Sequence, residues 1–137
     1  MPRGAAPLAL LTVLALGCDP SPEAAERRRV VAAIDAMREA PSRDPVRRRK
    51  LLDGLERQPA TTPEAIRARD ACASAYRLLF DGDDRAVALW RALADGGAPD
   101  PSSAEQLHAA EDAVAGARAA MPACELALDA LRHPPRG

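Results

Sequence analysis

Residues 102–132 read SSAEQLHAAEDAVAGARAAMPACELALDALR, and this stretch decides the fold. Its apolar side chains recur in alternating steps of three and four residues, which is the spacing of one face of an α-helix. About 30 residues at 1.5 Å per residue give a helix long enough to be the spine of a bundle. The apolar series consists of Leu107, Ala110, Val114, Ala117, Met121, Cys124, Leu128 and Leu131.

Two features set the expected start and shape of this helix. Ser102 stands three residues before Glu105, which is the spacing of a reciprocal capping box, so we expect Ser102 to be the N-cap. Pro122 removes one backbone donor and crowds the carbonyl one turn earlier. The helix is therefore expected either to kink at Pro122 or to break there into two.

The composition excludes several classes of protein. Alanine accounts for 32 of the 137 residues, and there is one Trp, one Tyr and one Phe. A β-sandwich or barrel is excluded, because strands need β-branched and aromatic side chains. The net charge of −1 and the helical spacing argue against a disordered chain. The isoelectric point near 6.1 is far from that of a typical nucleic-acid-binding domain.

Four more helical segments precede the long one. Three of them begin with a polar capping residue followed by proline, namely Ser21-Pro22, Asp44-Pro45 and Thr62-Pro63. Prolines or glycines mark the expected ends. The chain is therefore predicted to be all-α, with about five helices in an antiparallel bundle. The expected ranges of the first four are 22–40, 45–58, 63–82 and 84–95.

The fourth of these segments is the shortest. It is expected to turn Leu89, Trp90 and Leu93 inward, as one helical stripe. Three acidic residues surround the preceding glycine, but the twelve-residue loop of a calcium site, with its terminal glutamate, is missing. We therefore expect them to cap the start of the fourth helix; they are Asp81, Asp83 and Asp84.

Residues 1–17 have the pattern of a cleaved signal peptide. Arg3 is followed by an uncharged apolar run from Ala5 to Leu16. Twelve residues are too few to span a bilayer but fit the apolar region of a secretory signal. Ala15 and Gly17 supply the small residues expected at a cleavage site, so an ordinary secretory signal is one interpretation.

The run Leu14-Ala15-Leu16-Gly17-Cys18 resembles the lipobox of bacterial lipoproteins. The resemblance implies cleavage before Cys18 and a lipid on its thiol, with acyl chains such as palmitate. It further implies attachment to the cell membrane or outer membrane, with the domain in the periplasm or outside the cell. The expected organisation is a linker at 18–22, a helical domain at 23–133 and a flexible tail at 134–137.

The two remaining cysteines are expected to pair. Cys72 and Cys124 each fall on the apolar stripe of their own helix, and an exported domain meets an oxidising compartment. A disulfide between the two helices is therefore predicted. Free buried thiols, a redox pair and soft metal ligands remain alternatives, although no Cys-x-x-Cys spacing favours the last two.

Charge is divided unevenly along the chain. Residues 23–58 carry ten basic against seven acidic side chains, whereas residues 59–137 carry eight against twelve. Basic residues close to a lipid anchor can bind anionic headgroups. Ordinary solvated helix faces with local ion pairs are the alternative interpretation. The candidate headgroup contacts are Arg27, Arg28, Arg29, Arg43, Arg47 and Lys50.

No catalytic motif is present in the sequence, so an enzyme, a cofactor or a metal is not expected. Glu105-x-x-His108 matches half of the helix motif of di-iron bundles, but the second copy is missing. A non-enzymatic lipoprotein with a structural or protein-binding role is the predicted function. The alternative is a periplasmic carrier that binds a small ligand or a metal in the bundle core, with Tyr76, Trp90 and His108 lining the pocket.

Overall fold

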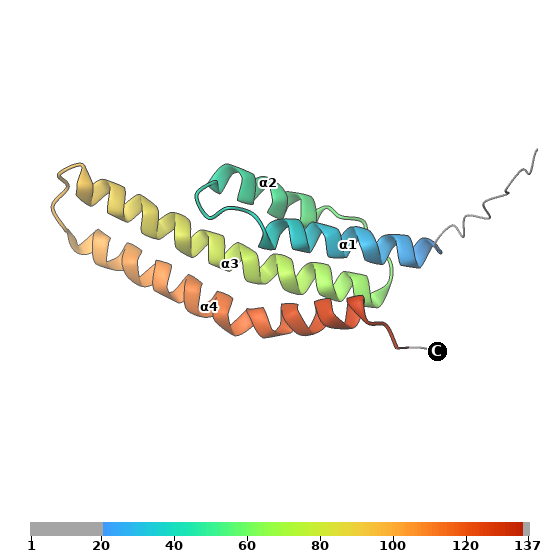
Figure 1. Cartoon of the computed structure of the whole chain (residues 1–137). Helices are drawn as coiled ribbons and strands as arrows, with labels where there is room; N and C mark the ends of the chain where they lie inside the picture. Colours follow the sequence, from blue (N-terminus) through green and yellow to red (C-terminus); the bar gives the residue numbers. More distant parts are fainter. Residues whose placement is uncertain (1–20, 136–137) are drawn as a thin grey trace, which may run out of the picture.

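The computed structural model describes residues 21–135, which form four α-helices and no β-strand. The helices are α1 (Pro22–Arg38), α2 (Pro45–Glu56), α3 (Pro63–Ala94) and α4 (Pro101–Arg132). Figure 1 shows α3 and α4 as one long antiparallel hairpin, with α1 and α2 packed over the part of it nearer the C-terminus. The all-α prediction is confirmed, but the predicted number of five helices is wrong.

The difference in number lies at Gly82, where the sequence predicts the end of one helix and the start of another. Helix α3 runs straight through this residue. A Cβ atom at Gly82 would lie 2.7 Å from Cγ2 of Val114 and 3.1 Å from the carbonyl oxygen of Ala110, both in α4. Glycine at this position therefore lets two helices come close together, and it does not terminate one.

The acidic residues around Gly82 hold α2 against α3 and cap no helix. Arg49 lies 2.8 Å from Asp81 and 2.6 Å from Asp84. Arg48 donates to Asp83 at 2.8 Å. These ion pairs replace the capping role that was predicted for the three aspartates, because the helix start they were expected to cap does not exist.

Arg48 is also one of two charged or polar residues buried in the part of the chain that the structure describes, the other being Glu26. Its guanidinium carbon lies 4.6 Å from the centroid of the Phe80 ring. A cation over an aromatic face is attractive, the more so when partly shielded from water. Arg48 therefore anchors α2 on α3 both by charge and by packing.

Helix α4 starts two residues earlier than expected and continues past Pro122. The N-cap is Asp100, whose carboxylate accepts from the amide of Ser103, while the Ser103 hydroxyl accepts from the amide of Asp100. Hydrogen bonds from Ser102 and Ser103 hold the pKa of Asp100 below its ordinary value. The predicted Ser102 cap is thus wrong. Of the two expectations for Pro122, the break is wrong: α4 is continuous and curves in Figure 1.

A buried carboxylate in α1 fixes the start of α3. Glu26 accepts hydrogen bonds from the amides of Thr61 and Thr62. Burial by itself would raise the pKa of Glu26, but the hydrogen bonds from the two threonines outweigh it and hold the pKa below its ordinary value. Thr62 is the N-cap of α3 and makes no capping bond with its own side chain, so Glu26 supplies the acceptor from another helix.

The hydrophobic core fills only part of the hairpin. Along α3 the core cluster ends at Phe80. Beyond it the buried hydrophobic residues are Leu89, Ala110 and Ala117, all between α3 and α4. We call residues 84–116 the distal arm. Asp84 at its start pairs with Arg48 and Arg49 of α2, but the buried side chains of this stretch lie between α3 and α4. The core cluster includes Val30, Ile34, Met37, Leu52, Leu55, Ala68, Cys72, Ala75, Tyr76, Phe80, Cys124, Leu128 and Leu131.

Alanine substitutions at two helical glycines should have opposite effects on stability. Gly82→Ala is expected to lower the free energy of unfolding by about 1–3 kcal/mol, because the added methyl group overpacks the contact with Val114. Gly54→Ala is the matched control in α2, where a Cβ would meet nothing within 4 Å. It should raise the free energy of unfolding by about 0.5–1 kcal/mol. Urea unfolding followed by circular dichroism measures both, and a gain at Gly82 would contradict the close contact.

Candidate interaction surface

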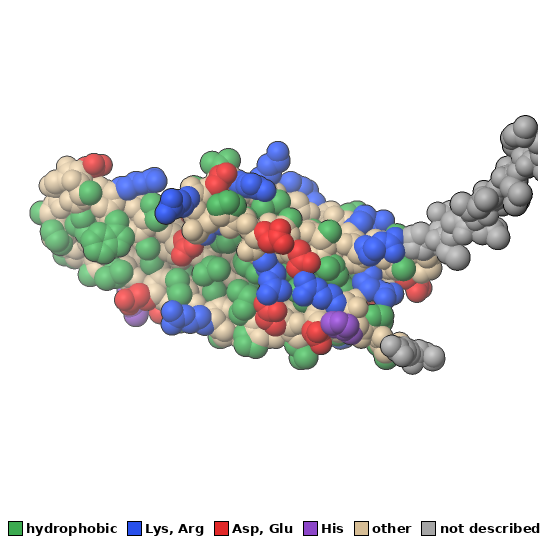
Figure 2. Space-filling model, in the orientation of Figure 1, with side chains coloured by type: hydrophobic (Ala, Val, Ile, Leu, Met, Phe, Trp, Pro, Cys, Tyr) green, Lys and Arg blue, Asp and Glu red, His purple; other side chains and the backbone are tan. Residues whose placement is uncertain are grey.

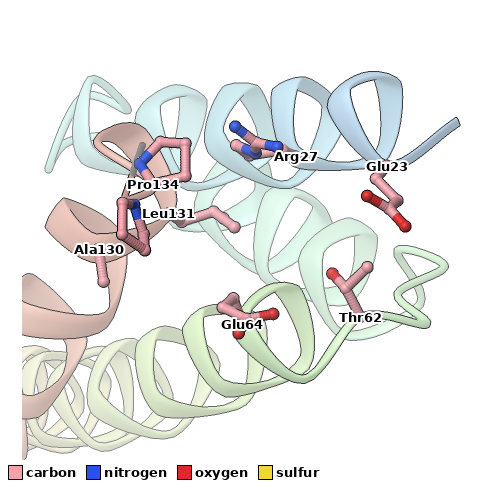
Figure 3. A pocket seen from close by; sticks show the side chains of 8 residues that line it. Glu23, Arg27, Thr62, Glu64, Ala130, Leu131 and Pro134 are labelled. Carbon is pink, nitrogen blue, oxygen red and sulfur yellow. The ribbon is translucent and has the colours of Figure 1, made fainter. Parts of the chain in front are cut away.

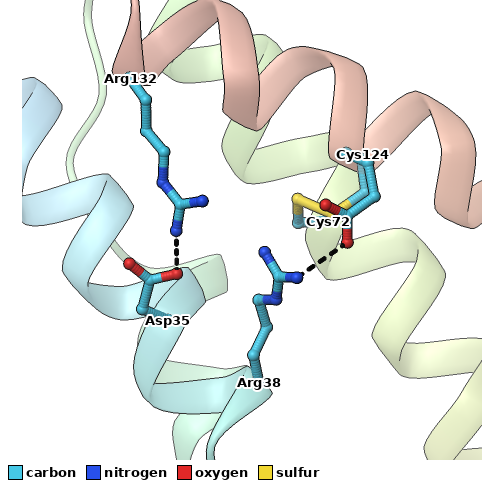
Figure 4. Close-up of a disulfide and its surroundings, with 6 residues drawn as sticks. Asp35, Arg38, Cys72, Cys124 and Arg132 are labelled. Atoms are coloured by element: carbon cyan, nitrogen blue, oxygen red, sulfur yellow. Dashed lines mark hydrogen bonds and ion pairs between the residues drawn. A yellow bond between two sulfur atoms is a disulfide. The ribbon is translucent and has the colours of Figure 1, made fainter.

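Cys72 of α3 and Cys124 of α4 lie at disulfide distance in the centre of the core. Both are fully buried, and their Sγ atoms are 2.07 Å apart. Figure 4 shows the pair with two ion pairs that tie α1 to α4 beside it, Asp35 with Arg132 and Arg38 with Glu125. The predicted pairing of these cysteines is confirmed at the level of geometry. Within residues 21–135 no group of three or more metal-ligating side chains comes together.

The predicted lipid attachment site lies outside the part of the chain that the structure describes. Cys18 and the expected signal segment at 1–17 precede Ser21, where that part begins. Among residues 21–135, no helix combines the length and the apolar character needed to cross a membrane.

The six basic residues predicted to meet headgroups fall into two separate groups. Arg27, Arg28 and Arg29 lie in the first turns of α1, whereas Arg43, Arg47 and Lys50 lie at the other end of α1 and in α2. Arg28 lies ten residues, roughly 15 Å, from the end of α1. Helix α2 then runs back beside α1, so that Arg47 and Lys50 line one hollow together with Ala33.

A pocket beside Arg27 is lined by both basic and acidic side chains. Figure 3 shows it between α1, the start of α3 and the end of α4, with Arg27 sharing the lining with Glu23 and Glu64. Its volume is about 260 Å³. One arginine beside two carboxylates does not favour an anionic ligand at this place.

The three residues of the predicted carrier pocket do not come together. Tyr76 is buried in the core, with its ring centroid 5.9 Å from that of Phe80. Trp90 lies 14 residues further along the same helix, about 21 Å away, and 70% of it is exposed. His108 is exposed and lies 3.6 Å from Asp112. The inward orientation predicted for Trp90 is wrong, and no ligand pocket unites these side chains.

The distal arm instead exposes large apolar side chains. Val87 and Trp90 are one turn apart on α3, and Leu107 lies on α4, with 45%, 70% and 46% of each residue exposed. Figure 2 shows hydrophobic side chains gathered at this end of the molecule. We call these three residues, together with a groove of about 290 Å³ that Leu107 lines, the distal surface. Val87 also lines a separate hollow beside the start of α2. The groove is lined by Gly82, Asp83, Ala86, Leu107, Ala110, Glu111, Val114, Ala115 and Arg118.

The sequence contained a signal for this surface. Leu89 is buried and Leu93 is half-buried, four residues apart on the side of α3 that faces α4. Trp90 stands one position, or 100° around the helix, from Leu89 and so falls beside that stripe. A helix that packs against a single neighbour buries only a narrow stripe of side chains. Leu89, Trp90 and Leu93 together form a wider stripe than that, so Trp90 is left exposed.

Comparison with protein families, with curated proteins and with solved structures finds no match to this chain. The function is therefore inferred from the surfaces that the fold presents.

Reduction of the disulfide should destabilise the protein strongly. The cysteines are 52 residues apart in sequence. Closing a loop of that length in the unfolded chain stabilises the fold by about 4 kcal/mol on the chain-entropy account. Thermal unfolding with and without reductant should show a large fall in Tm, equalled by Cys72→Ala without reductant. Cys18→Ser is the matched control and should respond to reductant as the native chain does. An unchanged Tm on reduction would contradict the pairing.

Proposed function

We propose that this protein is a membrane-anchored bacterial lipoprotein whose helical domain has a non-enzymatic role in binding another protein. The distal surface is the observation that carries this proposal. Monomeric proteins commonly expose single hydrophobic residues, whereas several large ones on the same part of the surface are typical of an interaction site. Tryptophan is enriched at the energetic centres of protein interfaces, and the only Trp of the chain lies here, largely exposed.

The anchor follows from the lipobox-like run that ends at Cys18. Only Asp19 and Pro20 separate Cys18 from Ser21, which caps α1. An acylated Cys18 would therefore hold the domain close to the bilayer, in the cell membrane or outer membrane and facing the periplasm or the exterior. Each buried acyl CH₂ contributes about 0.8 kcal/mol, so two chains or more anchor a protein stably.

The proposed anchor and the distal surface lie at different ends of the molecule. The arginines at 27–29 lie in the first turns after it, where each can gain about 1 kcal/mol from anionic headgroups. Trp90 lies 27 residues beyond Pro63, roughly 40 Å along α3 from the end at which α1 begins. Membrane attachment and partner binding therefore use opposite ends of the domain.

The anchor predicts a defined mature protein. Intact mass spectrometry of the membrane fraction should find a chain that begins at Cys18 and carries acyl chains. In Cys18→Ser the same chain should lack the lipid and leave the membrane fraction. A mature chain that begins elsewhere without lipid would contradict the anchor.

The distal surface predicts a partner at Trp90. A photo-crosslinking side chain at position 90, in cells that express the full chain, should yield an adduct with one other protein. The matched control is position 46, because Val46 of α2 is equally exposed, at 77%, but lies outside the distal surface. Equal adduct yields at positions 90 and 46 would contradict this assignment.

A further inference from the structure

Helix α4 carries a second row of side chains that face solvent. Its members recur in steps of four and three residues, the spacing with which one helix packs along another. All six are exposed, and Leu126 exposes 74% of its surface. The row consists of Leu107, Glu111, Ala115, Arg118, Pro122 and Leu126, and we call it the outer row.

The outer row has a symmetric arrangement of charge. Glu111 and Arg118 are its only charged members, and they stand seven residues apart, or two helical turns, on either side of the small residue Ala115. Neither has an ion-pair partner among residues 21–135. Both line the groove of the distal surface, which opens onto this row.

We propose that a second copy of this chain binds along the outer row, antiparallel, with a two-fold axis beside Ala115. In that arrangement Glu111 lies opposite Arg118 of the second copy, and Arg118 lies opposite its Glu111. A parallel arrangement would place like charges opposite one another, at a cost in free energy. The charge pattern therefore selects both the partner and its direction.

Apolar contacts complete the proposed interface. The small side chain of Ala115 lets the two α4 helices approach closely at the axis. Leu107 then lies opposite Pro122 of the second copy, since both are equally far from the axis in sequence. An interface in which the same patch serves both subunits is the commonest form of homodimer.

The pairing also has a consequence for the membrane, which rests on the proposed anchor. An antiparallel pair places its two Ser21 ends at opposite ends of the dimer. Two anchors in one bilayer then require the long axis of the dimer to lie along the membrane. Confinement to one surface raises the effective concentration, so an interface of modest area suffices.

Cysteine crosslinking in the native membrane tests the register. Ala115→Cys in the full chain should give a covalent dimer on a non-reducing gel after mild oxidation. Ala119→Cys is the matched control, because two copies of position 119 would be shifted by about 13 Å along the helices, too far for a disulfide. A dimer that forms equally well through position 119, or no dimer through position 115, would overturn the proposal.

Charge reversal in the Ala115→Cys background tests the partner. Glu111→Arg and Arg118→Glu should each reduce the crosslinked fraction about tenfold, because each reversal creates two like-charge pairs across the interface. Both reversals in one chain should restore the dimer, since the pairs re-form with exchanged signs. Asp112→Arg, on the same helix but outside the row, should have no effect. Reversals without effect, or no restoration in the double variant, would overturn the proposal, whereas an adduct at Trp90 with another protein would still support the proposed function.

Discussion

The close contact between α3 and α4 is the constraint on which the rest of the structure depends. Alanine at the facing positions and glycine at position 82 let the two helices approach within reach of backbone atoms, as the 3.1 Å from a Gly82 Cβ to the Ala110 carbonyl shows. Small side chains bury little apolar area per residue. A hairpin of this kind needs another source of stability, and the Cys72–Cys124 pair lies at the centre of its core.

Polar interactions attach the two shorter helices to this hairpin. Arg48 and Arg49 pair with the aspartates around Gly82 and hold α2. Glu26 receives the first amides before α3 and so fixes α1. A core rich in leucine and phenylalanine would make such contacts secondary. Here, with a single Phe in the chain, they hold α1 and α2 on the hairpin.

Local chemistry made much of the fold predictable from the sequence. A polar residue followed by proline begins every helix, and the starts at Pro22, Pro45 and Pro63 were predicted correctly. The pairing of Cys72 with Cys124 followed from their helical register. The role of Gly82 could not be predicted in the same way. A glycine that ends a helix and a glycine that lets a neighbouring helix come close give the same signal in the sequence. Because Gly82 was predicted to end a helix, the aspartates around it were predicted to be caps, and the helix that carries Trp90 was predicted to be much shorter than it is.

The surface on which the proposed function depends is exposed because of the architecture of the distal arm. Beyond the ion pairs of Asp84 with α2, the arm leaves Trp90 and the groove exposed at the end of the molecule away from the start of α1. The outer row of α4 shares Leu107 and three residues of the groove with the distal surface, runs from the arm onto the core half, and is complementary to a copy of itself. Both surfaces exist because α1 and α2 cover only one side of the hairpin.

Amide hydrogen exchange, measured on the purified protein at high dilution, tests most directly that the core is confined to one half of the hairpin. Amides of residues 65–80 and 117–131 should exchange slowly, at rates close to those set by global unfolding. Amides of residues 84–94 and 101–116 should exchange much faster, through local opening of a two-helix arm. Equal protection along the whole of α3 and α4 would contradict the confinement of the core to one half of the hairpin.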